Sequence, residues 1–311
     1  MTVMMRYFDL HCDTVTNLCG DELSDNRRLH ISLDRAPDIY IQCWAIFIPD
    51  GLRGDEAAEY YRRHRDIYLE QTEKHGVVRV TDCASLERAA QTGRGGILTV
   101  ESGAALGGRL SAIEELANDG VRMMTLTWNG ENELGFGSGD PDAPGLTAFG
   151  KAAVREMENC GITVDVSHLS DNGFWDVCEL AQKPFAASHS NSRAVYSHKR
   201  NLTDRQISAI AERGGLIGIN LYSDFLASGG ASQSDVAAHI RRLEALGAEE
   251  CIAFGADFDG ISRMPSGMTG IESIGGLAET LAESGISGTD AERYFFDNAY
   301  IFFFNLWRNG K

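Results

Sequence analysis

Tyr7-Phe8-Asp9-Leu10-His11-Cys12-Asp13 is a short apolar run that ends in ionisable side chains, and similar runs recur along the chain. From them we predict eight strands, at residues 6–12, 40–47, 96–100, 121–127, 161–166, 184–188, 215–220 and 251–256. Amphipathic segments lie between most of these strands, for example at residues 53–74, 109–118, 146–159, 203–213 and 233–246. Alternating strands and helices indicate a parallel sheet. Eight such units in 311 residues favour a closed (β/α)8 barrel of the α/β class over an open sheet.

The chain shows no low-complexity linker and no internal repeat, so we predict one barrel domain over residues 1–311. Neither the dinucleotide-binding glycine fingerprint nor a phosphate-binding loop follows the first strand. The glycine-rich stretch 130–145 follows the fourth strand, and we predict that it is a long active-site loop. The apolar stretch 300–304 is short and is expected to belong to a core helix.

Composition excludes several classes of protein. The formal net charge of -17 argues against a nucleic-acid partner, which would select a basic surface. No apolar run approaches the roughly 18 residues that span a membrane. The seven cysteines include no CxxC pair, which is typical of reduced thiols. The N-terminus lacks a basic segment followed by a long apolar stretch, so we expect a cytoplasmic protein.

Ionisable residues stand where the predicted strands end, and in a barrel that is where catalytic groups gather. His11 and Asp13 lie two residues apart, so an extended strand directs both side chains to one face. Taken singly, each such residue has an ordinary explanation: a His-Asp hydrogen bond, a helix-start charge at Glu101, or a core histidine. Five of the eight predicted strands end in such residues, which places them together at one rim of the barrel. This pattern predicts a metal site. The candidate ligands are His11, Asp13, Glu101, His168, His189 and Asp257.

These ligands are too many for one tetrahedral ion, and two ions bridged by a carboxylate fit the number. Zinc accepts imidazole and carboxylate ligands where thiolates are absent. Four of the other histidines are expected at the surface: His30, His64, His75 and His239. His198 falls in the loop after the sixth strand, and nothing in the pattern places it at the metals.

The combined motifs resemble the membrane dipeptidase (renal dipeptidase) family of the amidohydrolase superfamily. They occur in family order over nearly the whole chain, as Asp9-Leu10-His11-Cys12-Asp13, Val100-Glu101-Ser102-Gly103, Thr125-Leu126-Thr127-Trp128-Asn129, Asp165-Val166-Ser167-His168, Ser188-His189-Ser190, Lys199-Arg200-Asn201 and Gly255-Ala256-Asp257-Phe258-Asp259-Gly260. The resemblance implies a barrel that holds two Zn²⁺ ions.

The resemblance also implies roles for single residues. His11 and Asp13 would bind one ion, His168 and His189 the other, and Glu101 would bridge the two. Asp257 matches the acidic residue that handles protons, and we prefer it to Asp259 because it comes first after the strand. Arg200 matches the arginine that binds the substrate carboxylate, a pairing that suits a bidentate guanidinium.

One departure from the family concerns the substrate. Animal members carry a substrate-contacting histidine where this chain has Trp128, and an indole cannot accept a proton. The neighbouring Asn129 could donate a hydrogen bond, so we count Trp128 and Asn129 as candidate substrate-binding residues. Animal members also carry a signal peptide and a lipid anchor, which we do not expect here.

The resemblance predicts a metallo-dipeptidase that hydrolyses the amide bond of dipeptides with a hydroxide held between two zinc ions. The expected partner is a small dipeptide, with a homodimer as the common assembly of such enzymes. One alternative is another binuclear amidohydrolase, such as a deacylase, lactonase or deaminase, because Arg200 accounts only for the carboxylate end of a dipeptide. A second alternative is a non-catalytic barrel that binds small molecules, which the intact ligand set argues against.

Overall fold

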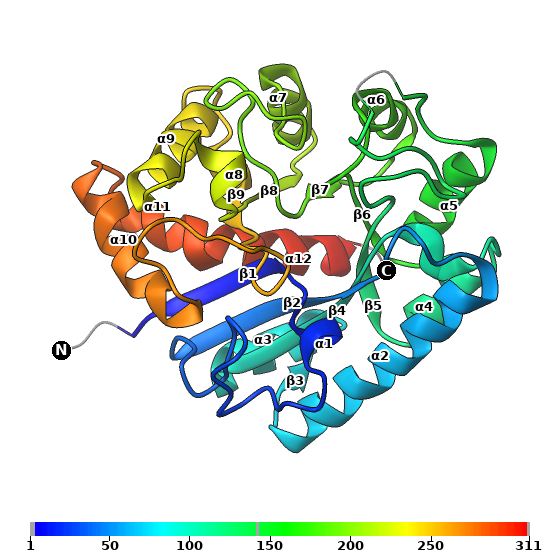
Figure 1. Cartoon of the computed structure of the whole chain (residues 1–311), viewed down its shortest axis with the longest axis horizontal. Coiled ribbons are helices and arrows are strands. Elements are labelled where there is room, and N and C mark those ends of the chain that lie inside the picture. The colour runs from blue at the N-terminus through cyan, green and yellow to red at the C-terminus, as the bar shows by residue number, and fades with distance from the viewer. Residues whose placement is uncertain (1–3, 141–142, 310–311) are drawn as a thin grey trace.

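The computed structural model describes residues 4–140 and 143–309, and its centre is a closed parallel barrel (Figure 1). Eight strands form the ring in the order β2, β1, β9, β8, β7, β6, β5, β4, and β4 pairs back to β2. Their bounds are β1 Arg6–Cys12, β2 Ile39–Phe47, β4 Arg94–Glu101, β5 Val121–Thr125, β6 Thr163–Asp165, β7 Ala186–Ala187, β8 Leu216–Ile219 and β9 Ile252–Phe254. The predicted (β/α)8 barrel is therefore confirmed.

The observed strands begin and end close to the predicted ones on one side of the barrel and are shorter on the other. β6 and β7 keep only three and two residues of strand geometry and are shorter than predicted at both ends. A further two-residue strand, β3 (Val78–Arg79), pairs with the lower part of β4 outside the ring, at Gly95 and Gly96. The sequence pattern does not predict it.

Helices surround the barrel, and the five predicted segments correspond to α2 (Gly54–Lys74), α4 (Ala112–Asn118), α5 (Ala148–Asn159), α7 (Asp204–Glu212) and α9 (Gln233–Glu244). The remaining helices are α1 (Thr14–Asn17), α3 (Cys83–Thr92), α6 (Asp171–Leu180), α8 (Ser223–Leu226), α10 (Ile274–Glu283), α11 (Gly288–Glu292) and α12 (Asn298–Asn309). In the described part of the chain, no helix is both long and apolar enough to cross a membrane.

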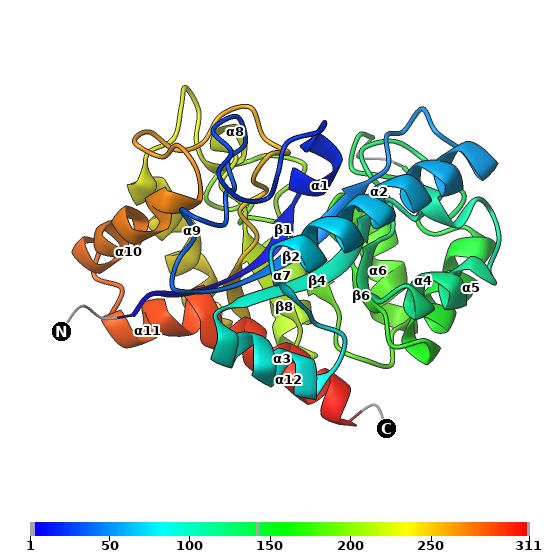
Figure 2. The same cartoon turned by 90° about the horizontal axis from the view of Figure 1, so that it is seen from below.

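The expected core helix at 300–304 lies within α12, which packs beside α3 (Figure 2). Phe8 of β1 stacks on Phe303 of α12 with ring centroids 5.6 Å apart, and Phe296 also packs against Phe8. Such aromatic pairs add to the stabilisation from buried apolar area. The C-terminal helix thus covers the start of β1, which leaves the opposite, C-terminal rim of the strands open for a site.

Candidate metal centre

The C-terminal rim brings together all six residues that the sequence predicts as ligands or proton carrier. His11 Nε2 lies 3.8 Å from Asp13 Oδ1, 3.6 Å from Glu101 Oε2 and 3.8 Å from Asp257 Oδ1. The imidazole rings of His168 and His189 complete the cluster, with centroids 4.9 Å apart. Ligand atoms of His11, Glu101 and His189, and of His11, Asp13 and Asp257, form two groups compact enough to hold an ion each.

Glu101 lies between the two halves of this cluster. It is the last residue of β4, and its side chain is buried, so the helix-start explanation does not describe its surroundings. Its Oε2 faces His11 at 3.6 Å, whereas its Oε1 lies 2.8 Å from His168 Nε2 and 3.6 Å from His189 Nε2. One carboxylate that offers a different oxygen to each set of imidazoles has the geometry that a bridging ligand requires.

The chemistry of the cluster fits divalent cations. Three buried atoms that point into it, His11 Nε2, Asp13 Oδ1 and His189 Nε2, have no hydrogen-bond partner among the described residues. Burial lowers the pKa of His11 to about 3 and raises the pKa of both Asp13 and Glu101 well above the ordinary carboxyl range. Neutral imidazoles beside unpaired carboxylates are costly to bury without a counter-charge, and bound cations would supply it.

Hydrogen bonds behind two of the histidines direct Nε2 into the cluster. A histidine that binds metal through Nε2 keeps its proton on Nδ1 and usually donates it to a fixed acceptor. For His168 that acceptor is Asn129 Oδ1, at 3.1 Å. For His189 it is Ser188 Oγ, at 2.7 Å, because the serine hydroxyl itself donates to Asp165 Oδ2 at 2.5 Å. Asn129 lines the same cavity as His168. Asn129 is a candidate substrate-binding residue from the sequence, which does not predict its hydrogen bond to His168.

Asn129→Leu should weaken divalent-ion binding about 10- to 100-fold, the usual effect of losing such an orienting partner. Leucine has the same branched shape as asparagine but cannot accept the Nδ1 proton of His168. Asn129→Asp keeps an acceptor and should stay within a few-fold of the parent protein. Competition against a chromophoric chelator measures the affinity directly. Equal affinity in Asn129→Leu and the parent protein would show that Asn129 does not orient His168.

Asp257 is held by a partner that sequence reasoning missed. Asn220 follows β8 and is fully buried, and its Nδ2 donates to Asp257 Oδ2 at 2.9 Å while Asp257 Oδ1 faces His11. Burial raises the pKa of Asp257 to about 7 in the absence of cations. Gly260 closes the turn, where a Cβ would lie 2.3 Å from Asp257 Oδ1 and 2.2 Å from Asp13 Oδ2. A side chain at this position would displace both carboxylates.

Asp259 instead forms hydrogen bonds that stabilise the turn. Its Oδ2 accepts from Thr14 Oγ1 and its Oδ1 from the backbone N–H of His30, both at 2.6 Å. Both Asp257 and Asp259 have positive φ angles, of 63° and 64°, a conformation that is unfavourable for residues other than glycine. His168 shares it, with φ 66°. Strained backbone of this kind gathers where a site must present particular side chains.

Arg200 lies beside the centre in the loop after β7. It is buried, its Nε has no hydrogen-bond partner among the described residues, and its Nη2 donates to the carbonyl of His189 at 3.4 Å. Its guanidinium carbon lies 5.5 Å from the centroid of the Phe225 ring. Burial lowers the pKa of Arg200 to about 10, although the carboxylates of Asp257 and Glu101 oppose this change. An incompletely paired buried cation is suited to an anionic ligand.

The remaining histidines correct part of the sequence interpretation. His239 is fully buried and His64 nearly so, so the expected surface position is wrong for both. His239 Nδ1 accepts from the backbone of Ser192 and its Nε2 donates to the carbonyl of Leu226, both at 3.0 Å. These bonds compensate for its burial. His198 is half-buried, stacks on Phe225, and accepts from the backbone N–H of Arg200 at 3.2 Å.

A cavity of about 370 Å³ opens over the cluster. Its wall includes Glu101, Asp257, His168, Trp128 and Phe225. The predicted active-site loop 130–145 borders the same rim: Ser138 N–H donates to the carbonyl of His168 at 2.7 Å. Residues 141 and 142 of that loop lie outside the described residues.

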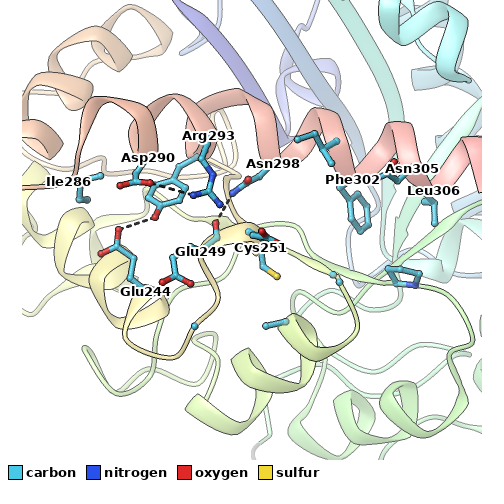
Figure 3. Close-up of a pocket in the computed structure, with 18 of the residues that line it drawn as sticks. Glu244, Glu249, Cys251, Ile286, Asp290, Arg293, Asn298, Phe302, Asn305 and Leu306 are labelled. Atoms are coloured by element: carbon cyan, nitrogen blue, oxygen red, sulfur yellow. Dashed lines mark hydrogen bonds and ion pairs between the residues drawn. The ribbon is translucent and has the colours of Figure 1, made fainter.

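A larger hollow of about 1350 Å³ lies at the other end of the barrel, beside α9, α11 and α12 (Figure 3). Asn298 there donates to the carbonyl of Glu249 at 2.8 Å, and Tyr294 donates to Glu244 at 2.9 Å. None of the clustered ligands lines it. The smaller cavity is therefore the one that carries the chemistry.

A (β/α)8 barrel with a buried His and carboxylate centre at its C-terminal rim defines a metal-dependent hydrolase. The family model of membrane dipeptidase (peptidase family M19) matches residues 1–302, and the chain belongs to that family. The protein is thus a hydrolase of the metallo-dipeptidase class.

Relatives agree in sequence and in structure. The chain is 34% identical over 200 residues to a Klebsiella pneumoniae protein from the pqqA 5′ region, an overlap of 61% of this chain and 73% of that one. It is similar to the dipeptidase AC, a metallopeptidase of family M19, with 26% identity and a TM-score of 0.90 over 98% of this chain and 99% of that chain. A Rhodobacter sphaeroides metallopeptidase, liganded with a phosphinate mimic of L-Ala-D-Ala, shares the fold with 24% identity and a TM-score of 0.89, over 99% and 100% of the chains.

Proposed function

We propose that the protein is a zinc-dependent dipeptidase that binds two Zn²⁺ ions and hydrolyses the amide bond of free dipeptides. The observation that carries this proposal is Glu101, which offers one oxygen to His11 and the other to His168 and His189. His11 and Asp13 would hold one ion, His168 and His189 the other, and Glu101 would bridge them. When bound, the ions would make a shared water nucleophilic as hydroxide near neutral pH and stabilise negative charge on the carbonyl oxygen.

The protein's own residues would bind the substrate and move the proton. The guanidinium of Arg200 would bind the C-terminal carboxylate, which fixes the dipeptide across the centre. Asp257 would accept a proton from the attacking water as the new C–O bond forms, and would deliver it to the amide nitrogen as the C–N bond breaks. Asn220, hydrogen-bonded to Asp257 Oδ2, would keep Oδ1 directed at the reacting atoms.

The proposal is tested with protein of known metal content against matched substrates. Free dipeptides should be hydrolysed, whereas the same peptides with an amidated C-terminus, an acetylated N-terminus or a third residue should be poor substrates. Lactones, N-acyl amino acids and aminated bases are assayed in parallel, because they are the substrates of lactonases, deacylases and deaminases. Turnover of one of these groups without turnover of dipeptides would replace the proposal with that activity.

Arg200→Ala should raise KM for free dipeptides about 10- to 100-fold, because a charge-assisted hydrogen bond to a carboxylate contributes about 1.5–3 kcal/mol. The effect should be smaller for C-amidated peptides, which lack the carboxylate. Lys199→Ala is the matched control, since Lys199 is an exposed cation in the same loop. His198 is unsuitable as a control because it contacts both Arg200 and Phe225. Equal changes in Arg200→Ala and Lys199→Ala would contradict the assignment.

A further inference from the structure

Three aromatic side chains form a wall on one side of the cavity. Phe47 and Trp128 pack edge to face with ring centroids 4.8 Å apart. Tyr60 of α2 lines the cavity with them. All three side chains are partly exposed. We call Phe47, Tyr60 and Trp128 the aromatic wall.

The aromatic wall lies next to the candidate metal ligands. Phe47 is paired in register with Glu101, and Glu101 is paired with Thr125 of the next strand. The Trp128 ring lies 6.3 Å from the ring of His168. A substrate atom held over Glu101 and His168 is therefore within reach of the wall.

The aromatic wall is also held firmly by its backbone. Asp50, in the loop after β2, accepts from the backbone N–H of Gly130 at 2.8 Å, which ties the segment after Phe47 to the segment after Trp128. Gly139 N–H donates to the carbonyl of Asn129 at 3.1 Å. A Cβ at Gly137 would lie 2.1 Å from the Trp128 carbonyl oxygen, so the loop packs tightly against the backbone of Trp128. Preorganised walls of this kind discriminate between side chains better than mobile ones.

Phe47 of the aromatic wall and Arg200 lie on opposite sides of the centre. β2 and β7 stand four strands apart in the ring of eight, whereas β5, which precedes Trp128, stands two strands from β7. Phe47 ends β2, whereas Arg200 follows β7 and contacts Phe225 of α8, just after β8. A dipeptide with its C-terminal carboxylate on Arg200 and its amide carbonyl over the centre extends its N-terminal residue toward the wall.

We propose that the aromatic wall receives the side chain of the N-terminal residue and makes the enzyme selective for dipeptides that begin with a large apolar residue. This inference rests on the proposed dipeptidase function. Trp128 has a specificity role here because its indole supplies apolar surface in the cavity wall. Apolar contacts on this scale change kcat/KM by about 10- to 200-fold.

The test uses metal-loaded protein and two series of dipeptides. In the first series the N-terminal residue is Gly, Ala, Leu or Phe before a constant C-terminal residue, and in the second the C-terminal residue varies after a constant glycine. We expect kcat/KM for Leu-first to exceed Gly-first by at least about tenfold. Phe47→Ala should reduce that ratio to near one, because kcat/KM falls more for Leu-first and Phe-first peptides than for Gly-first peptides, and it should leave the relative order of the C-terminal series unchanged.

Trp128→Leu is a second variant that keeps part of the apolar surface, so the test still works if Phe47→Ala does not fold. Its ratio of Leu-first to Gly-first kcat/KM should lie between those of the parent protein and Phe47→Ala. A flat N-terminal series in the parent enzyme, with dipeptides still hydrolysed, overturns the inference and leaves the dipeptidase function intact. A Phe47→Ala effect confined to the C-terminal series also overturns it, because the aromatic wall would then contact the C-terminal residue of the dipeptide. No hydrolysis of any dipeptide overturns the proposed function itself.

Discussion

Asp257→Asn should lower kcat for a good dipeptide substrate by at least about 100-fold, the usual contribution of a general acid–base residue. The substitution keeps the shape of the side chain and can still accept from Asn220 Nδ2, but an amide oxygen takes up no proton near neutral pH. Steady-state kinetics with metal analysis of the same samples measures the effect. We expect the metal content to change little if Asp257 mainly carries protons.

Asp257 could instead act as a ligand, since it forms a compact group with His11 and Asp13. Loss of one ion in Asp257→Asn would contradict the proton-carrier role and support the ligand role. Asp259→Asn is the matched control. Its carboxylate bonds to Thr14 and the His30 backbone rather than to the cluster. The substitution should therefore lower the free energy of unfolding by about 1 kcal/mol, which lowers the melting temperature. It should leave kcat nearly unchanged. The reverse pattern would exchange the roles of the two aspartates.

The fold and the gathering of the candidate ligands could be predicted from the sequence because both follow from simple periodicities. A two-residue spacing directs His11 and Asp13 to one face of an extended chain, and they do meet, at 3.8 Å. The ends of parallel strands share one rim, so residues as distant as His11 and Asp257 could be expected together. Neither argument depends on side-chain packing.

Features that depend on turns and packing could not be predicted in the same way. β9 ends at Phe254, and the chain then turns through the positive φ angles of Asp257 and Asp259, so an extended chain is a poor guide to where Asp259 points. The bond between Asn129 and His168 joins two loops, and the burial of His239 depends on contacts with Ser192 and Leu226. Asn220 gave a usable signal: it is a polar residue at the end of the predicted strand 215–220, and the candidate ligands also stand where predicted strands end.

Glu101→Gln should abolish most activity and reduce the stabilisation that metal gives to the fold. The parent protein should contain two divalent ions per chain, and chelation should lower its melting temperature, because a ligand at 100 times its Kd stabilises the fold by about 2.7 kcal/mol. Glutamine keeps the volume of Glu101 but loses the charge and one of the two ligand oxygens, so we expect at most one ion and a fall in kcat of at least about 100-fold.

The metal-free forms should rank in the opposite order. Burial and the neighbouring carboxylates raise the pKa of Glu101, so the residue costs the fold nothing at low pH, where it is protonated in both states, and destabilises the metal-free fold as the pH rises above the ordinary carboxyl pKa. At pH 8 the chelated Glu101→Gln variant should therefore melt at or above the temperature of the chelated parent protein, while the metal-loaded variant melts below the loaded parent. Glu131→Gln, the same substitution at an exposed position on the rim loop, should change neither ranking. A Glu101→Gln variant that keeps two ions and full activity would show that Glu101 does not bridge the centre.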